Sequence, residues 1–265
     1  MGRNGGDGMS LSREEQSRLL ACMLDMGELL LDAGAEISRV EDTLERMGRA
    51  YGAARMDVLV ITAVITLTMA FPGDESTTET RRIRSTGQTD FSRLERLNAL
   101  SRQCCAAPLP LTQLRREIDD VATQGKPASK QLWGSVLLGG SFAVFFGGSL
   151  WDGLVAAAFA GLIFLLQDRL GRTKLNTVAF NLLVSLIVGL GVGLVTAVVP
   201  ALHMDMILIG DIMLLIPGLA ITNAVRNLLV GDTISGVMRL AESLIWAGAL
   251  AGGFMVALMV VNALR

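Results

Sequence analysis

The uneven placement of charge along the chain limits its fold more than any other feature. Residues 1–130 hold 17 of the 23 Lys and Arg and 19 of the 25 Asp and Glu, which leaves six of each sign for residues 131–265. A long stretch so rich in apolar residues and so poor in charge is typical of membrane-embedded protein. The sequence therefore predicts one water-soluble part followed by one part that lies in a bilayer.

The second half of the chain contains apolar segments of membrane-spanning length. We expect five helices, because each segment can cross a core of about 30 Å at a rise of about 1.5 Å per residue. The connection after the second segment carries Arg169, Arg172 and Lys174. By the positive-inside rule this connection and the charged N-terminal half are cytoplasmic, and five crossings put the C-terminus outside. The predicted helices lie near 131–150, 152–168, 175–199, 206–230 and 237–262.

The fourth apolar segment carries the strongest functional signal. Asp211 lies within its first turns, and a central Asp costs roughly 2.5–3.5 kcal/mol on insertion scales, so such acids usually face a protein interior or a wet cavity. Pro217 and Gly218 follow, and they predict a kink or break in the helix. Broken membrane helices typically line a cavity. We therefore predict that Asp211 and the Pro217-Gly218 break form part of a substrate or proton pathway.

Other polar residues of the membrane part extend this prediction. After the break, Asn223 and Arg226 share a helical face, and Arg239 and Glu242 also lie one turn apart. The second pair is either a solvated ion pair at a helix end or a gating pair. The predicted pathway also includes Asp232, and Asn176 and Asn181 at the start of the third membrane helix.

The N-terminal half is predicted to be an α+β domain. Ser12 and Glu15 have the spacing of a helix capping box, and apolar residues follow with helical rhythm to about Gly34. A second amphipathic helix ends near Ala50. The alternation from 57 to 71 favours strands, 77–84 can return as a third strand, and two further helices lead to Gly125. The predicted organisation is a disordered stretch 1–11, an α+β cytoplasmic domain 12–125, a linker 126–130, and an all-α membrane bundle of about five helices over 131–265.

Several functions are excluded by what the sequence lacks. The net charge of −2 offers no broad basic surface for nucleic acid. The three cysteines fit neither a disulfide framework nor a C-x-x-C metal spacing, and the single histidine, His203, cannot form a metal site alone. No nucleotide or hydrolase motif is present. We therefore expect no enzyme, no cofactor and no metal, and we assign His203 no role.

Two sets of residues carry a family resemblance. One lies in the N-terminal half: Glu36 with Arg39 and Glu41, the strand end at Thr62, Thr80-Arg81-Arg82-Ile83, and Asn98 within Leu97-Asn98-x-Leu100-Ser101-Arg102. The other runs from Ile216-Pro217-Gly218 through Asn223, Arg226, Gly231-Asp232 and Ser235-Gly236 to Arg239 and Glu242. With these residues the chain resembles the threonine/serine exporter family, over nearly its whole length from about Leu20. It departs from the family pattern at Thr62-Ala63, where a Pro-Thr pair is expected.

The resemblance implies a function and a partner. It is to the split form of the family, in which a long subunit with a cytoplasmic domain works with a short membrane subunit. It implies a component of a secondary exporter in the bacterial inner membrane, with threonine and serine, or a dicarboxylate such as succinate, as substrate. Lipid and a second copy of the chain are further expected partners.

Two other functions stay open at this stage. The chain could be a regulatory or scaffold subunit of a transporter, in which case the partner alone would transport. It could also be an intramembrane aspartyl hydrolase, but that chemistry needs two neighbouring acids, and Asp232 and Glu242 lie beyond the break from Asp211. Proton-coupled export is the function that we predict.

Overall fold

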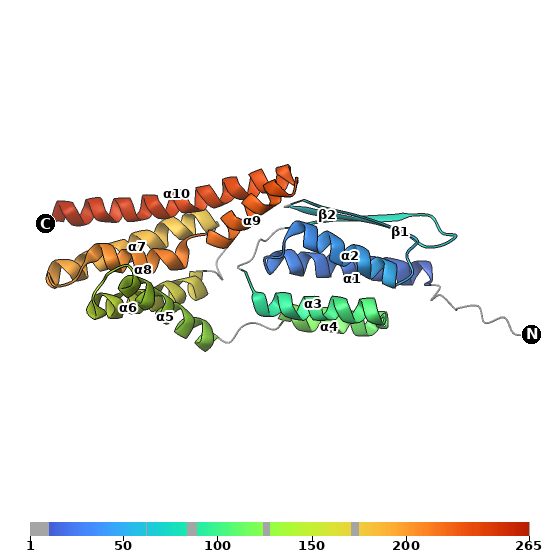
Figure 1. Ribbon diagram of the computed structural model, residues 1–265, viewed down its shortest axis with the longest axis horizontal. Helices are drawn as coiled ribbons and strands as arrows, with labels where there is room; N and C mark the ends of the chain where they lie inside the picture. The colour runs from blue at the N-terminus through green and yellow to red at the C-terminus, as the bar shows by residue number, and fades with distance from the viewer. Residues whose placement is uncertain (1–10, 62, 84–88, 124–127, 171–174, 265) are drawn as a thin grey trace, which may run out of the picture. The chain divides into compact units, whose positions relative to one another are not determined.

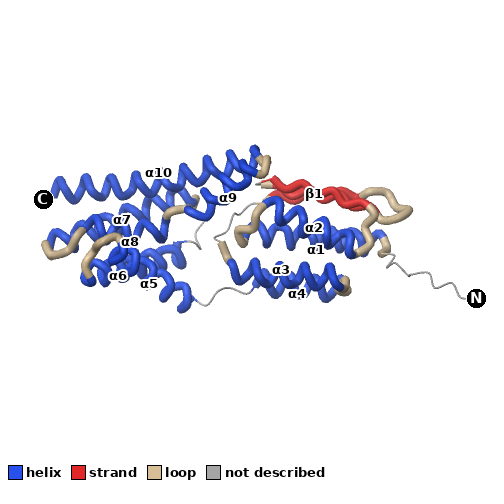
Figure 2. The backbone as a smooth tube through the Cα atoms, in the orientation of Figure 1, coloured by secondary structure: helices blue, strands red, loops and turns tan. Residues whose placement is uncertain are grey.

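The computed structural model describes residues 11–61, 63–83, 89–123, 128–170 and 175–264. Its elements divide into two compact units, one made of 1–125 with 227–235 and the other of 126–226 with 236–265. Strands occur only in the first unit, where they are drawn in red in Figure 2. The predicted order, a small sheet among helices followed by helices alone, is confirmed for the described residues.

The first unit has three layers (Figure 1). One layer is an antiparallel sheet in the order β1-β2-β3, with β1 at Arg55–Ile61, β2 at Val64–Ala70 and β3 at Thr77–Arg82. Helices α1 (Arg13–Asp32) and α2 (Ile37–Ala50) cover one face of it. Helices α3 (Phe91–Ala106) and α4 (Leu111–Thr123) pack on the far side of α1 and α2.

Local sequence signals explain where these elements begin and which faces they bury. Ser12 and Glu15 make the reciprocal bonds of a capping box at the start of α1, and the Asp90 side chain caps α3. In the sheet, Val60 pairs with Ile65 and points inward, whereas the Thr66 hydroxyl meets that of Thr80 on the exposed face. The buried face of the sheet packs against α1 and α2 in one apolar core. The alternation of apolar residues along the strands predicts this buried face.

The second unit consists of helices alone. They are α5 (Ala128–Phe145), α6 (Leu150–Leu170), α7 (Thr177–Val198), α8 (Met204–Leu215), α9 (Gly218–Leu229) and α10 (Thr233–Leu264). The end of α9 and the start of α10, within 227–235, belong to the first unit. Their inner surface is closely packed and apolar around Ala156, Val188 and Ile207. Small residues permit this packing, since a Cβ on Gly210 of α8 would lie 2.5 Å from the carbonyl oxygen of Gly139 in α5.

The expected count of five membrane helices is not supported. By length and composition α6, α7 and α10 could cross a membrane, and α8 with α9 adds a fourth if that bent pair is one span. The expected first span falls on α5, which has 18 residues but includes the polar residues Ser129, Lys130 and Gln131 in its first turn, so it is too polar to qualify with the others. The placement of the C-terminus, which depends on an odd number of crossings, therefore stays a prediction.

Candidate functional site

A break in a membrane helix organises the candidate site. Helix α8 ends at Leu215, α9 begins at Gly218, and the two axes bend by 53°. Pro217 has no N–H to continue the ladder, and the Gly218 N–H turns back to the carbonyl of Ile216 at 2.9 Å. The break that the Pro-Gly pair predicts is thus present.

Asp211 lies one turn before this break and is completely buried, with 0% of its surface exposed. Within the described parts of the chain, neither of its carboxyl oxygens has a hydrogen-bond partner. Its neighbour Gly210 lies directly against α5, so this part of α8 has little room to move. A charged carboxylate in such a place loses its hydration without compensation, so the group needs a proton or a cation as a partner.

The two predicted asparagines of α7 occupy different places. Asn176 is exposed and caps α7, because its side-chain oxygen accepts from the N–H of Val178 at 3.1 Å. Asn181 is buried, with 7% exposed, on the inner side of the same helix. Neither amide bonds to Asp211, whose oxygens have no partner among the described residues. The polar path that would connect them stays a prediction.

The polar residues beyond the break have mixed surroundings. Asn223 of α9 is half-buried and Arg226 is exposed. The Asp232 side chain accepts from the N–H of Ser235 at 3.4 Å, at the start of α10, so it serves as a helix cap. Arg239 and Glu242, one turn apart on α10, are both half-buried, and their pairing stays a prediction.

Two polar residues near the membrane part were missed by the sequence analysis. Asn227 at the end of α9 is 3% exposed, and its side-chain nitrogen has no partner within the described ranges. Its spacing of four from Asn223 was an available signal. Asp152 is completely buried at the start of α6 and accepts from Ser149 and from His203. The pattern Ser149-x-x-Asp152 is a capping spacing and could have been recognised.

The predicted motif of the first unit is spread over two helices. Glu36 is the N-cap residue of α2, and Arg39 is exposed one turn later. Glu41 accepts from the N–H of Val60 at 2.9 Å and so ties α2 to β1. Burial raises the pKa of this carboxyl, and the bond from Val60 opposes that rise. Asn98 is exposed on α3, and Thr62 lies outside the described residues.

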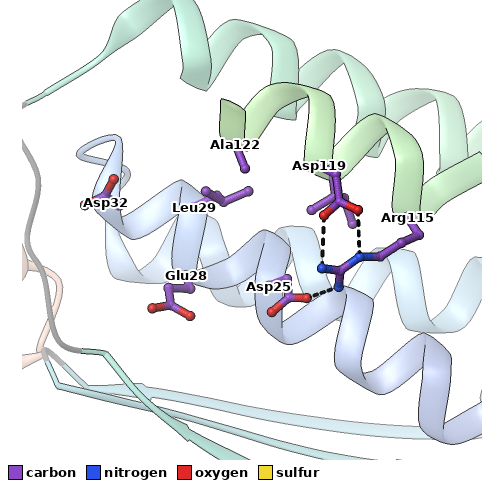
Figure 3. A pocket seen from close by; sticks show the side chains of 8 residues that line it. Asp25, Glu28, Leu29, Asp32, Arg115, Asp119 and Ala122 are labelled. Carbon is purple, nitrogen blue, oxygen red and sulfur yellow. Dashed lines mark hydrogen bonds and ion pairs between the residues drawn. The ribbon is translucent and has the colours of Figure 1, made fainter. Parts of the chain in front are cut away.

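The first unit also has an open groove of about 400 Å³ between α1 and α4 (Figure 3). Acidic residues of the groove form ion pairs with arginines. Arg115 pairs with Asp25 and Asp119, and Arg93 pairs with Asp32 at 3.0 Å. No set of three His, Cys, Asp or Glu in the described chain is arranged to hold a metal ion. The ion pairs connect three helices, and we interpret the groove as part of the packing of this unit.

Comparison with known proteins places the chain in a family. Residues 21–261 match the model of the ThrE family, described as "Putative threonine/serine exporter". The chain belongs to the threonine/serine exporter family. The resemblance drawn from Glu36 to Glu242 is therefore confirmed at the level of the family.

Two relatives in this family match most of the chain. It is 24% identical over 248 residues to the "Probable threonine/serine exporter" of Mycobacterium tuberculosis. This alignment covers 91% of this chain and 46% of that protein. The chain is 24% identical over 238 residues to the "Threonine/serine exporter" of Corynebacterium glutamicum, covering 86% and 48%. The chain thus spans about half the length of these relatives. No solved structure matches it.

Proposed function

We propose that the chain is one component of a proton-coupled secondary exporter for a small metabolite that carries a carboxylate. Membership of the exporter family supports export as the general function. The observation that carries the mechanism is Asp211, a buried carboxyl without a hydrogen-bond partner in the described structure, one turn from a broken helix. The protein would lie in the bacterial inner membrane with its α+β unit in the cytoplasm.

Asp211 is the proposed proton carrier. A carboxyl enclosed by apolar neighbours and bonded to nothing is stable when it is neutral, and it becomes stable as an anion only when water or a cation reaches it. Access from one side of the membrane at a time would then load and unload a proton. An amino-acid substrate adds a second option, because its ammonium group could pair with the ionised carboxylate.

The start of α9 is the proposed site for the substrate carboxylate. The first N–H groups of a helix point outward without intrahelical partners and carry a partial positive charge. There is open space at the first residues of α9 in the described structure. A Cβ on Gly218 would meet no described atom within 4 Å, and Leu219 is 52% exposed. Asn223, one turn further, would orient the ligand, and Arg226 would supply a cation at the cytoplasmic end.

A second membrane component completes the proposed exporter. The chain covers under half of each relative's length. The open side of the α8–α9 break would face lipid if the chain acted alone, and irregular backbone is tolerated in a membrane only where protein or water covers it. We therefore propose that a short membrane subunit of the same family covers this side.

Counterflow in proteoliposomes tests the proposal. Vesicles with the chain and the short subunit are compared with vesicles that lack either one, using labelled threonine, serine and succinate. We expect exchange only with both components and for one substrate class. Full exchange by the short subunit alone would contradict the proposal and make this chain a regulatory subunit, and no exchange of any substrate would contradict it as well.

A further inference from the structure

A buried connection joins two turns of the membrane unit that lie 51 residues apart in sequence. Asp152, at the start of α6, accepts from the N–H and the hydroxyl of Ser149 at 2.7 and 2.8 Å. It also accepts from the backbone N–H of His203 at 2.8 Å, and its Oδ2 lies 2.9 Å from Nδ1 of the His203 ring. Asp152 is completely buried, whereas the His203 side chain is 63% exposed.

Capping α6 does not by itself require His203. Ser149 and Asp152 already exchange the reciprocal bonds of a capping box, with the Asp152 N–H donating to the Ser149 hydroxyl at 3.2 Å. The bonds to His203 are additional, and they come from the N-cap residue of α8. The same two turns also touch through Gly148, where a Cβ would lie 3.1 Å from the Cβ of Met206 in α8.

We propose that Asp152 and His203 form a pH-sensitive connection that fixes the start of α8 and thereby positions Asp211. Helix α8 has only 12 residues, and its other end is the Pro217 break, so its N-terminal anchorage, together with the packing of Gly210 on α5, determines where Asp211 lies. Asp211 follows His203 by eight residues, which is about 12 Å along a helix. The role of Asp211 rests on the proposed function, whereas the connection itself does not.

The charges around His203 determine the direction of the pH effect. The ring is faced by Asp152 from α6 and by Asp205 from the first turn of its own helix. The hydrogen bond and the charge of Asp152 raise the pKa of His203 above the ordinary value of 6.5, and Asp205 acts in the same direction. The protonated ring therefore adds stability below the unfolded-state pKa, and this contribution is lost as the pH rises through the folded-state pKa.

A titration of the ring tests the connection directly. Because the chain has a single histidine, labelled-histidine NMR of the full protein in detergent micelles, purified with a tag that lacks histidine, gives one set of ring signals. We expect a midpoint above 6.5 in the wild type, a fall toward 6.5 in D152N, and a smaller fall in the control D205N. A wild-type midpoint at or below 6.5, or a midpoint that D152N leaves unchanged, would overturn the proposal.

A second variant keeps the test decisive if D152N does not fold. His203 is largely exposed, so H203Q removes the titrating ring and leaves the buried carboxylate and its bonds from Ser149 in place. In the wild type the midpoint temperature of unfolding should decrease as the pH is raised from about 6 to about 8. In H203Q this decrease should be smaller. Equal slopes in the two proteins would overturn the connection.

Transport separates this proposal from the proposed function. In counterflow at equal pH on both sides, H203Q should export at acidic pH more slowly than the wild type, with a weaker dependence on pH. A wild-type histidine midpoint at or below 6.5, together with intact transport, would overturn the connection and leave the proposed function standing. A midpoint above 6.5 that falls in D152N, together with transport that H203Q does not change, would overturn the link between the connection and Asp211.

Discussion

Gly210 offers the most direct mechanical test of how Asp211 is held. A methyl group in the Gly210→Ala variant would lie 2.5 Å from the Gly139 carbonyl oxygen, 3.0 Å from the Ala143 Cβ and 3.1 Å from the Ala143 nitrogen. Two of these three atoms are backbone, so no flexible side chain can move aside. Helices α5 and α8 must separate, and overpacking of this kind costs about 1–3 kcal/mol.

Gly248→Ala is the matched control for this substitution. Gly248 lies in α10, where a Cβ would meet no described atom within 4 Å. Both changes replace a helical Gly by Ala and gain about the same helix propensity, up to roughly 1 kcal/mol. The difference between the two variants therefore isolates the steric cost at Gly210. For a chain of this size that cost corresponds to roughly 2–12 °C in the midpoint of thermal unfolding.

Thermal unfolding of the two purified variants in the same detergent measures this difference. We expect Gly248→Ala to unfold at or slightly above the wild-type temperature and Gly210→Ala to unfold clearly below it. Equal midpoints, or a Gly210→Ala variant more stable than the control, would refute the close contact between α5 and α8.

Two predictions concern the first unit. Tyr51→Phe removes a buried hydroxyl that donates to the Leu109 carbonyl at 2.9 Å, which should lower the free energy of unfolding by about 1 kcal/mol in urea titrations followed by circular dichroism; no loss would contradict the bond. Glu41→Gln should stabilise the protein at neutral pH, because burial raises the pKa of Glu41 and its charged form costs stability above the unfolded-state value of 4.5. This gain should disappear when the pH falls below that value, where the wild-type carboxyl is protonated, and a gain that persists there would contradict the argument.

Sequence patterns predicted the first unit well because its signals are local. The capping box of Ser12 and Glu15, the cap at Asp90 and the alternation of Ile65, Leu67 and Met69 each act within a few residues. The break at Pro217 is equally local, since a missing N–H ends the helical ladder wherever it falls.

Features that depend on contacts between distant residues were not predictable in this way. One error was local instead: the span expected over 131–150 began after Lys130, whereas α5 begins at Ala128 and includes the polar residues Lys130 and Gln131. The contact of His203 with Asp152 was not predicted, because Asp152 comes from another helix. That Asp211 has no bonded partner among the described residues is likewise a property of packing, which the sequence suggested only through the rarity of acids in membrane helices.

Proton movement driven by substrate tests the central claim most directly. Vesicles that contain both components and a pH-sensitive dye are supplied with the exported substrate, and the wild type is compared with Asp211→Asn and with Asp205→Asn, an exposed acid on the same helix. If Asp211 carries the proton, Asp211→Asn abolishes substrate-driven proton flux and Asp205→Asn retains it. Proton flux at the wild-type rate in Asp211→Asn would contradict the account.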